Sequence, residues 1–296
     1  MGRIQALAYL TAALWMSGLV ACSREHSLTV GSKNFTEQVI LGEIVAQHLE
    51  HRLGRKVERK LNLGGTLLAH QALVNGEIDV YPEYTGTALT AVLKLPPSGD
   101  AAAVLTRVRE EYRSRYRVEW LEPLGFNNTF AMVVRGEDAR KNRIERLSEA
   151  AGYQPGWRLG MGYEFQQRPD GLAGFLDTYH LPVHGTPQTM DLGLLYKALE
   201  QKQVDMVAAN ATDGMLAALD VVVLQDDKKY FPPYQGVLAT RTDALTAYPP
   251  LREALNELAD KLSDPVMRKL NYQVDGEHRR EQEVAAQFLR DSGLAR

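Results

Sequence analysis

The sequence predicts an α/β protein made of two similarly built lobes that face a common crevice. Two observations lead to this prediction. Short apolar runs typical of strands alternate with stretches typical of helices, as in mixed or parallel sheets. One helix–strand pattern also occurs twice, 126 residues apart: residues 78–80, followed by Tyr84, correspond to residues 204–206, followed by Asn210. This repeat indicates that each lobe directs one strand-to-helix turn at the crevice.

The first copy of the repeated pattern lies in residues 76–87, which we expect to fold as a strand, a turn and the start of a helix. Pro82 cannot donate a hydrogen bond to a sheet, so the strand is predicted to end there, and a helix is expected over residues 88–94. Such a turn presents free backbone N–H groups at the edge where open α/β sheets bind ligands. Tyr84 and Thr87 lie in this turn and are therefore candidate binding residues.

The first residues of the chain are predicted to be a secretory signal. Arg3 precedes a largely apolar run at 6–20, which is too short to span a bilayer comfortably. The run ends in Leu-Val-Ala-Cys at 19–22, which resembles the lipobox of bacterial lipoproteins. Cys22 is the only cysteine of the sequence, and we expect it to be lipidated and to anchor the mature protein outside the cytoplasmic membrane.

The elements of the first lobe follow from apolar periodicity and from residues that begin or end helices. In chain order we expect strand 28–30, helix 36–53, strand 57–63, helix 64–75, strand 78–81, helix 88–94 and helix 101–116. Thr36 is expected to cap the long helix and Gly54 to end it. His48 and His51 lie one turn apart on this helix. We interpret them as solvated residues and not as a metal-binding pair, because neighbouring acidic ligands are lacking.

The second lobe is predicted to begin after a loop at 121–129, which leads Phe130 into strand 131–134, and a charge-dense stretch at 135–143 supports this boundary. The remaining elements are helix 169–179, helix 190–199, strand 204–206, buried strand 221–224, strand 237–240 and helices within 249–289. The predicted parts of the chain are a leader at 1–21, a tether at 22–27, lobe 1 at 28–128 and 235–296, and lobe 2 at 129–234.

Composition and motifs argue against several classes of protein. The net charge of −3 gives no electrostatic reason to expect a nucleic-acid partner. The sequence contains no G-x-S-x-G elbow, no H-E-x-x-H, no P-loop and no paired cysteine ligands. We therefore expect a binding protein with no catalytic site, no metal and no cofactor.

Six side chains suited to a zwitterion gather at the predicted crevice turns. They are the aromatic Tyr84, Phe130 and Tyr234 and the polar Lys33, Thr87 and Arg168. Aromatic faces attract a quaternary ammonium ion, which has no N–H to donate, whereas basic and hydroxyl groups bind a carboxylate. Taken singly, Lys33 and Arg168 are interpreted as solvated charges, and Phe130 and Tyr234 as core residues. Ligand binding is therefore predicted from the combination.

Six motifs resemble those of the substrate-binding proteins of osmoprotectant ABC importers. They are G-S-K-N-F-T-E-Q at 31–38, Y-P-E-Y-T-G-T at 81–87, G-F-N-N-T-F at 125–130, R-P-D-G at 168–171, A-T-D-G at 211–214 and F-P-P-Y at 231–234. That family binds glycine betaine, choline, carnitine and related quaternary ammonium compounds for uptake and osmoprotection. The resemblance implies a two-lobed periplasmic-binding-protein fold of type II with its ligand in the cleft. It also implies an extracytoplasmic, lipid-anchored monomer that serves an ABC permease and its ATPase.

The resemblance also assigns positions within the site. The family's aromatic cage falls on Tyr84, Phe130 and Tyr234, and its carboxylate-binding positions fall on Lys33, Thr87 and Arg168. The chain departs from the family at two cage positions: Phe130 stands where tyrosine is common, and Asn210 replaces a cage tyrosine. A cage of three aromatic walls should hold trimethylammonium less tightly, or Asn210 should hydrogen-bond a bulkier or more polar ligand.

Three alternatives remain open at this point. The same fold could bind a different ligand, such as an ergothioneine-like betaine or an amino acid. The protein could be a ligand-sensing module that regulates a partner, or a hydrolase built on the same scaffold. Neighbouring permease and ATPase genes would favour transport over sensing, and turnover of an ester panel would favour the hydrolase.

Overall fold

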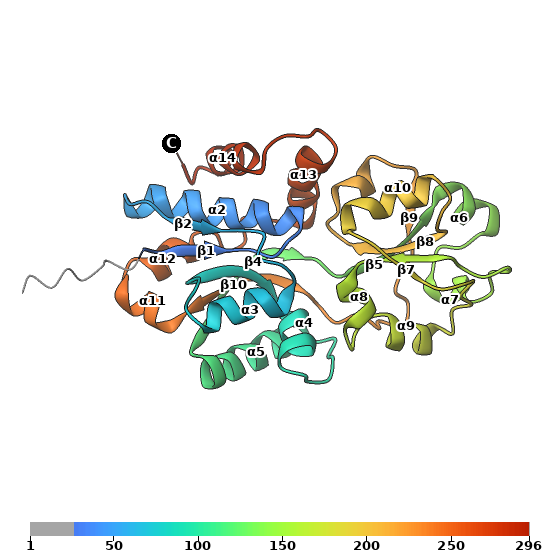
Figure 1. The fold of residues 1–296 in the computed structure, drawn as a ribbon, viewed down its shortest axis with the longest axis horizontal. Helices are drawn as coiled ribbons and strands as arrows, with labels where there is room; N and C mark the ends of the chain where they lie inside the picture. Colours follow the sequence, from blue (N-terminus) through green and yellow to red (C-terminus); the bar gives the residue numbers. More distant parts are fainter. Residues whose placement is uncertain (1–26, 296) are drawn as a thin grey trace, which may run out of the picture.

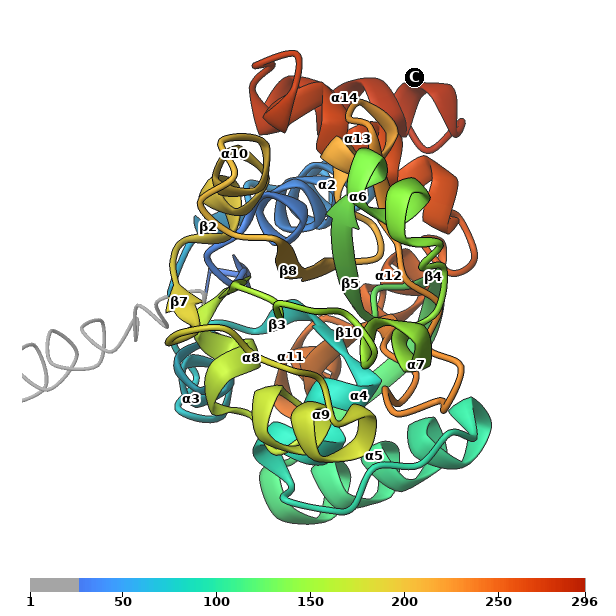
Figure 2. The same cartoon turned by 90° about the vertical axis from the view of Figure 1, so that its right-hand side faces the viewer.

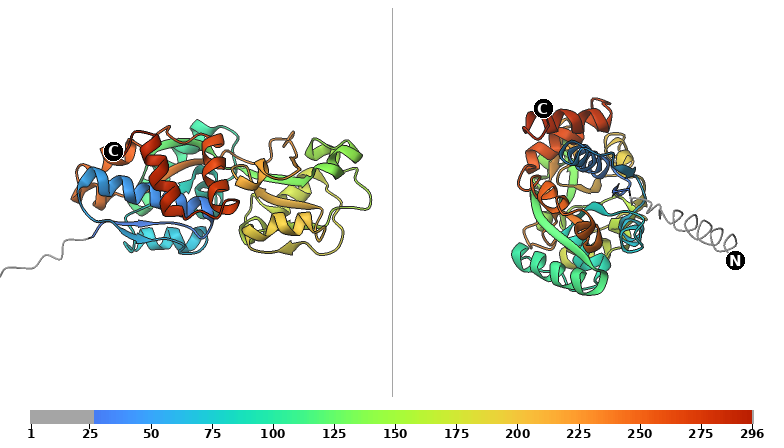
Figure 3. Two further views of the ribbon diagram at one scale, coloured as in Figure 1. Left: turned by 90° about the horizontal axis from the view of Figure 1, so that it is seen from above. Right: turned by 90° about the vertical axis from the view of Figure 1, so that its left-hand side faces the viewer.

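The computed structural model describes residues 27–295, which form two five-stranded sheets with helices on both faces of each (Figure 1). The two sheets lie side by side along the long axis of the molecule, and each is the centre of one lobe. Seen from above, the two lobes lie end to end along the long axis of the molecule (Figure 3). The predicted α/β architecture with two lobes is therefore confirmed.

The first sheet has the strand order β2-β1-β3-β10-β4. Its strands are β1 (Thr29–Gly31), β2 (Glu58–Lys60), β3 (Val80–Tyr84), β4 (Val118–Asn127) and β10 (Gln235–Arg241). Strand β1 is parallel to β2 and β3, whereas β10 is antiparallel to both β3 and β4. The chain thus returns from the second lobe to insert β10 next to the central strand of the first.

Helices cover this sheet on both faces, with α2, α13 and α14 on one side and α3 and α5 on the other (Figure 2). They are α2 (Thr36–Leu53), α3 (Thr66–Val74), α4 (Thr85–Thr87), the π-helical η1 (Ala88–Val92), α5 (Ala101–Tyr116), α11 (Thr242–Ala247), α12 (Leu251–Asn256), α13 (Asp264–Asp275) and α14 (Glu281–Asp291). Two buried apolar clusters fill the two sides of the sheet. This burial is the main stabilising term of the lobe.

The second sheet repeats the arrangement of the first, with the strand order β7-β6-β8-β5-β9. Its strands are β5 (Phe130–Arg135), β6 (Leu159–Met161), β7 (Gln188–Thr189), β8 (Met206–Asn210) and β9 (Val221–Val223). Strand β6 is parallel to β7 and β8, and β5 is antiparallel to β8 and β9. The central strands β3 and β8 are the two copies of the pattern found in the sequence, so the predicted internal repeat is confirmed.

The helices of the second lobe are short. They are α6 (Gly136–Asn142), α7 (Leu147–Ala150), α8 (Tyr163–Gln167), α9 (Leu172–Tyr179), η2 (Leu192–Leu194), α10 (Leu195–Glu200) and η3 (Gly214–Ala217). The chain crosses between the sheets after Asn127 and again before Gln235. The two crossings are bonded to each other, because the Asn128 N–H donates to the Tyr234 carbonyl at 3.0 Å and the Tyr234 N–H donates to Asn127 Oδ1 at 2.6 Å.

One predicted loop is a strand. Residues 121–127 of the predicted loop 121–129 form most of β4, which pairs with β10 through shifted register at two places. Pro123 is tolerated there because β4 is at the edge of its sheet. The partner strand lies more than a hundred residues later in the chain, so local sequence gave no indication of this pairing.

Smaller predictions were also wrong. Phe35 is the N-cap of α2, and the hydroxyl of Thr36 donates instead to Asp275 at 2.7 Å. His48, interpreted as solvated, is fully buried, and its Nε2 forms a hydrogen bond with the Ala254 carbonyl at 2.8 Å. Strand β9 is an edge strand whose Val223 is 46% exposed, so it is not a buried strand.

The predicted leader and Cys22 lie outside the described residues. Between residues 27 and 295, none of the helices combines the length and the apolar character that crossing a membrane requires.

Candidate functional site

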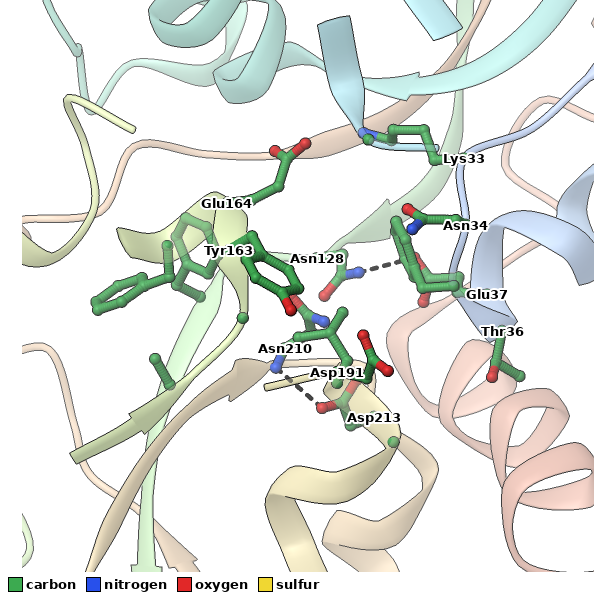
Figure 4. Close-up of a pocket in the computed structure, with 18 of the residues that line it drawn as sticks. Lys33, Asn34, Thr36, Glu37, Asn128, Tyr163, Glu164, Asp191, Asn210 and Asp213 are labelled. Carbon is green, nitrogen blue, oxygen red and sulfur yellow. Dashed lines mark hydrogen bonds between the residues drawn. The ribbon is translucent and has the colours of Figure 1, made fainter. Parts of the chain in front are cut away.

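A cavity of about 1250 Å³ lies between the two lobes and is lined by both of them (Figure 4). All seven side chains predicted for the site line it: Lys33, Tyr84, Thr87, Phe130, Arg168, Asn210 and Tyr234. Pockets for drug-sized ligands typically measure about 300–1,000 Å³, so the cavity is large enough for a small organic ligand. The structure therefore brings together segments that are up to 201 positions apart in the sequence (33 to 234).

The two central strands deliver side chains to the cavity from opposite sides. Tyr84 is the last residue of β3 and Asn210 the last residue of β8. In the second sheet Asn210 pairs with Phe130, the first residue of β5. These positions are the strand ends at which open α/β sheets bind ligands.

The aromatic side chains form two surfaces. Phe130 and Tyr234 lie with ring centroids 5.7 Å apart, and Phe165 packs edge-on against Phe130 at 5.0 Å. Tyr84 lies apart from them and stacks with Phe35 at 6.4 Å. Tyr234 also belongs to the apolar core of the first lobe, as its interpretation as a core residue predicted.

Basic groups lie over both aromatic surfaces. Lys33 Nζ is 4.7 Å from the centroid of Tyr84, and Arg168 Cζ is 5.0 Å from that of Phe130 and 5.3 Å from that of Tyr234. Lys33 and Arg168 are 4% and 9% exposed, so their interpretation as solvated charges was wrong. Cation–π contacts of this kind hold the two basic groups against the cavity wall.

Each of these basic groups is paired with a carboxylate of the protein. Lys33 Nζ donates to Glu83 Oε1 at 2.6 Å. Arg168 donates to both oxygens of Asp170, at 2.9 and 2.6 Å, and its Nη1 donates to the Thr87 hydroxyl at 2.8 Å. Burial acts to raise the pKa of Asp170, but the bonds from Arg168 outweigh it and hold that pKa below its usual value. The pair is therefore ionised at neutral pH.

Several bonds join the two lobes beside these pairs. Glu164, from α8, accepts from the Thr66 N–H at 2.7 Å and from the Thr66 hydroxyl at 2.9 Å, at the start of α3. Asp170 accepts from the Thr90 hydroxyl at 2.8 Å and from the Tyr234 hydroxyl. The hydroxyl of Thr87, bonded to Arg168, is a further link of the same kind.

Sequence reasoning missed the carboxylates that line the cavity, and two of these, Glu37 and Asp213, are buried in hydrogen-bond networks. Glu37 is buried and accepts from four side chains, and Asp213 accepts from the Asn210 N–H and the Tyr196 hydroxyl, each at 3.0 Å. Burial raises the pKa of Asp213 to about 7. Both residues lie within the quoted motifs at 31–38 and 211–214, which was the one signal that could have drawn attention to them.

Comparison with known proteins identifies the family. The family model for the substrate-binding domain of the ABC-type glycine betaine transport system matches residues 26–291. The glycine-betaine-binding protein of Pseudomonas aeruginosa is 36% identical over 98% of this chain and 95% of its own length. The ergothioneine transport permease/ergothioneine binding protein EgtU of Helicobacter pylori is 34% identical over 96% of this chain, which spans 51% of that protein.

The fold agrees with the sequence comparison. A crystal structure described as a glycine betaine/carnitine/choline ABC transporter superposes with a TM-score of 0.76 at 32% identity, covering 90% of this chain and 99% of that one. The predicted two-lobed fold of periplasmic binding proteins is thereby confirmed. The chain belongs to the family of substrate-binding domains of ABC-type glycine betaine transport systems.

Proposed function

We propose that this substrate-binding protein binds a quaternary ammonium compound of the glycine betaine, choline and carnitine class and delivers it, chemically unchanged, to a permease driven by an ATPase. The observation that supports this most strongly is the convergence of three aromatic and two basic side chains on one cavity between the lobes. The names of the related proteins, glycine-betaine-binding protein and glycine betaine/carnitine/choline transporter, support the same class.

The aromatic surfaces supply the binding of the ammonium group. Tyr84 faces the cavity from the first sheet and Phe130 from the second, with Tyr234 beside Phe130. A quaternary ammonium ion held among these rings gains about 0.5–2 kcal/mol per ring once water is excluded. Because the rings come from both lobes, full contact requires the lobes to be close together.

The polar side of the cavity supplies the binding of a carboxylate. Arg168, Lys33 and the Thr87 hydroxyl would receive it, but both basic groups are already paired with Asp170 and Glu83. A ligand carboxylate would therefore join an existing network of hydrogen bonds. Each charged hydrogen bond that it accepts would contribute about 1.5–3 kcal/mol to binding. Together with three cage contacts the total is about 3–9 kcal/mol, and the upper part of this range corresponds to micromolar affinity, about −8 kcal/mol.

A thermal-shift screen of glycine betaine, choline, carnitine and ergothioneine tests the proposed function. A ligand present at 100 times its Kd stabilises the folded protein by about 2.7 kcal/mol, which is a clear increase in the unfolding temperature. A shift with one of these compounds and none with an uncharged osmolyte is the expected result. The absence of a shift with every quaternary ammonium compound would contradict the proposal.

A larger betaine bearing N–H or O–H donors, such as ergothioneine, is the second candidate ligand. It is favoured by the second-lobe wall of the cavity, where Asn210 occupies the position of the fourth cage residue and Asp213 lies beside it (Figure 4). Both side chains offer oxygen acceptors to donors of a ligand. The relative from Helicobacter pylori, named as an ergothioneine transporter, supports this candidate.

We infer that the lobes open and close about the two crossings, with the ligand held in the closed form. The hydrogen bonds that Thr66 donates to Glu164 and that Arg168 donates to Thr87 require the lobes to be close, so opening breaks them. Addition of a saturating ligand should lower the radius of gyration measured by small-angle X-ray scattering. An unchanged radius of gyration, with binding established separately, would contradict hinge closure.

We further propose that Cys22 carries a lipid anchor that holds the protein on the extracytoplasmic side of a membrane. The sequence Leu-Val-Ala-Cys at 19–22 after an apolar leader supports this. Cys22→Ser should move the protein from the membrane fraction to a soluble or unprocessed form, as judged by fractionation and immunoblotting. A variant that is processed and fractionates like the wild type would show that the lipobox assignment is wrong.

A further inference from the structure

The carboxylate of Glu37 is the meeting point of four separate parts of the structure. Glu37 Oε1 accepts from the Tyr84 hydroxyl at 2.6 Å and from Asn128 Nδ2 at 2.8 Å. Glu37 Oε2 accepts from Asn271 Nδ2 at 3.0 Å and from the Thr212 hydroxyl. Each oxygen thus accepts two hydrogen bonds, which satisfies the acceptor capacity of the group.

One of the four donors, Thr212, belongs to the second lobe, whereas the other three lie in the first lobe or in the crossing next to it. Tyr84 ends the central strand of the first sheet, and Asn128 lies in the first crossing, where its bond to Glu37 is visible (Figure 4). Thr212 belongs to the turn that follows β8 in the second lobe. Asn271 lies on α13 and also donates to the Thr212 carbonyl at 2.8 Å.

Burial makes these bonds strong and their loss costly. Glu37 is 3% exposed and all four partners are buried as well. Charge-assisted hydrogen bonds are roughly twice as strong as neutral ones, and an unsatisfied buried acceptor costs about 1–3 kcal/mol, or more when it is charged. Burial raises the pKa of Glu37 above its usual value, and the hydrogen bonds from the four donors offset only part of this shift.

We propose that Glu37 is a positioning residue that couples closing of the lobes to the orientation of the Tyr84 ring in the ligand cage; this rests on the ligand site proposed above. When the second lobe closes, the Thr212 hydroxyl reaches Glu37 Oε2. The same carboxylate holds the Tyr84 hydroxyl through Oε1 and so fixes the ring against which the cation binds. The Glu37 carboxylate therefore stabilises both the closed arrangement of the lobes and the orientation of Tyr84 that binds the cation.

The same helix provides a matched control. Glu43 is 2% exposed and lies on α2 like Glu37, but it does not line the cavity. Within residues 27–295 its carboxylate accepts from Arg59 Nε at 3.2 Å and from Gln47 Nε2 at 3.1 Å, and both partners belong to the first lobe. Glu43→Gln therefore removes a buried charge of the same helix without touching the proposed coupling. Any effect common to both glutamine variants reflects stability alone.

The experiment compares Glu37→Gln and Glu43→Gln with the wild type. The ligand is the quaternary ammonium compound that gives the largest thermal shift. Affinity is measured by calorimetric titration, and compaction by small-angle X-ray scattering with and without this ligand. We expect Glu37→Gln to weaken binding at least ten-fold and to reduce the ligand-induced compaction. A glutamine amide has one acceptor oxygen and an NH2 group in place of two acceptor oxygens, so it cannot accept from both asparagine amides and both hydroxyls. We expect Glu43→Gln to bind within about two-fold of the wild type. Equal affinities of Glu37→Gln and the wild type would overturn the proposal.

Two milder substitutions remove single bonds and keep the test decisive if Glu37→Gln does not fold. Tyr84→Phe keeps the ring but breaks its bond to Glu37, and Thr212→Val breaks the bond across the lobes. Each substitution should weaken binding. The double variant should lose less binding free energy than the sum of the two single losses, because both substitutions act through the carboxylate of Glu37. Strictly additive effects, or wild-type affinity in Thr212→Val, would overturn the coupling. If the wild type binds none of the compounds, the proposed function itself fails, which is a distinct result.

Discussion

Replacing Arg168 with alanine is expected to abolish measurable ligand binding and to destabilise the protein by about 3–5 kcal/mol. The substitution leaves Asp170 buried without its cation, and breaking a buried ion pair by removing one partner has a cost of this size. It also removes the donor to the Thr87 hydroxyl and the cation over Phe130. Denaturant unfolding measures the first effect and calorimetric titration the second.

Arg158 offers a control within the same lobe. It also donates twice to one carboxylate, Asp205, at 2.7 and 2.6 Å, but it is 41% exposed, and Asp205 keeps a second partner in Arg135. Arg158→Ala should therefore change stability by no more than about 1 kcal/mol and leave affinity unchanged. Equal behaviour of the two alanine variants would show that the buried pair of Arg168 and Asp170 has no special role.

Asn210→Tyr should tighten binding by up to about thirty-fold or weaken it by up to about a hundred-fold or more, and the direction identifies the kind of ligand. Asn210 and Phe130 are a cross-strand pair between β8 and β5, so a ring introduced at position 210 lies next to Phe130. For a small betaine this adds a fourth wall and should tighten binding by about 0.5–2 kcal/mol. For a larger ligand that hydrogen-bonds the amide, each bond lost costs about 1–3 kcal/mol.

Asn210→Ala separates the two explanations, because it removes the amide without adding a ring. With a small betaine, we expect the alanine variant to bind like the wild type and the tyrosine variant to bind more tightly. Loss of binding in both variants, with the fold intact by circular dichroism, would exclude the small betaine and favour a ligand held by the Asn210 amide.

The general architecture was predictable because it depends on local patterns. The alternation of strands with helices and the repeat that places Tyr84 and Asn210 at equivalent strand ends identified both lobes. The insertion of β10 beside β3 and the pairing of β4 were not predictable, because each depends on a partner strand that is distant in sequence. Pro123 made β4 look like a loop, and only its position at a sheet edge allows a strand there.

The candidate site was predictable in its composition but not in its connections. The motifs located the residues that line the cavity, yet they gave no indication that Lys33 and Arg168 are buried and already paired with carboxylates. Glu37 and Asp213 were missed because a single acidic residue forms no sequence pattern that indicates its role. Their roles depend on donors supplied by elements far apart in the chain, such as Thr212 for Glu37.

Calorimetric titration of the wild type and Tyr84→Ala with glycine betaine, choline and carnitine tests the central claim most directly. We expect micromolar binding of at least one of these compounds by the wild type. It also predicts a loss of at least ten-fold in Tyr84→Ala, because the variant lacks one cage wall and one donor to Glu37. No binding of any quaternary ammonium compound by the folded wild type would contradict the proposed function. Wild-type affinity in a folded Tyr84→Ala protein would contradict the proposed site.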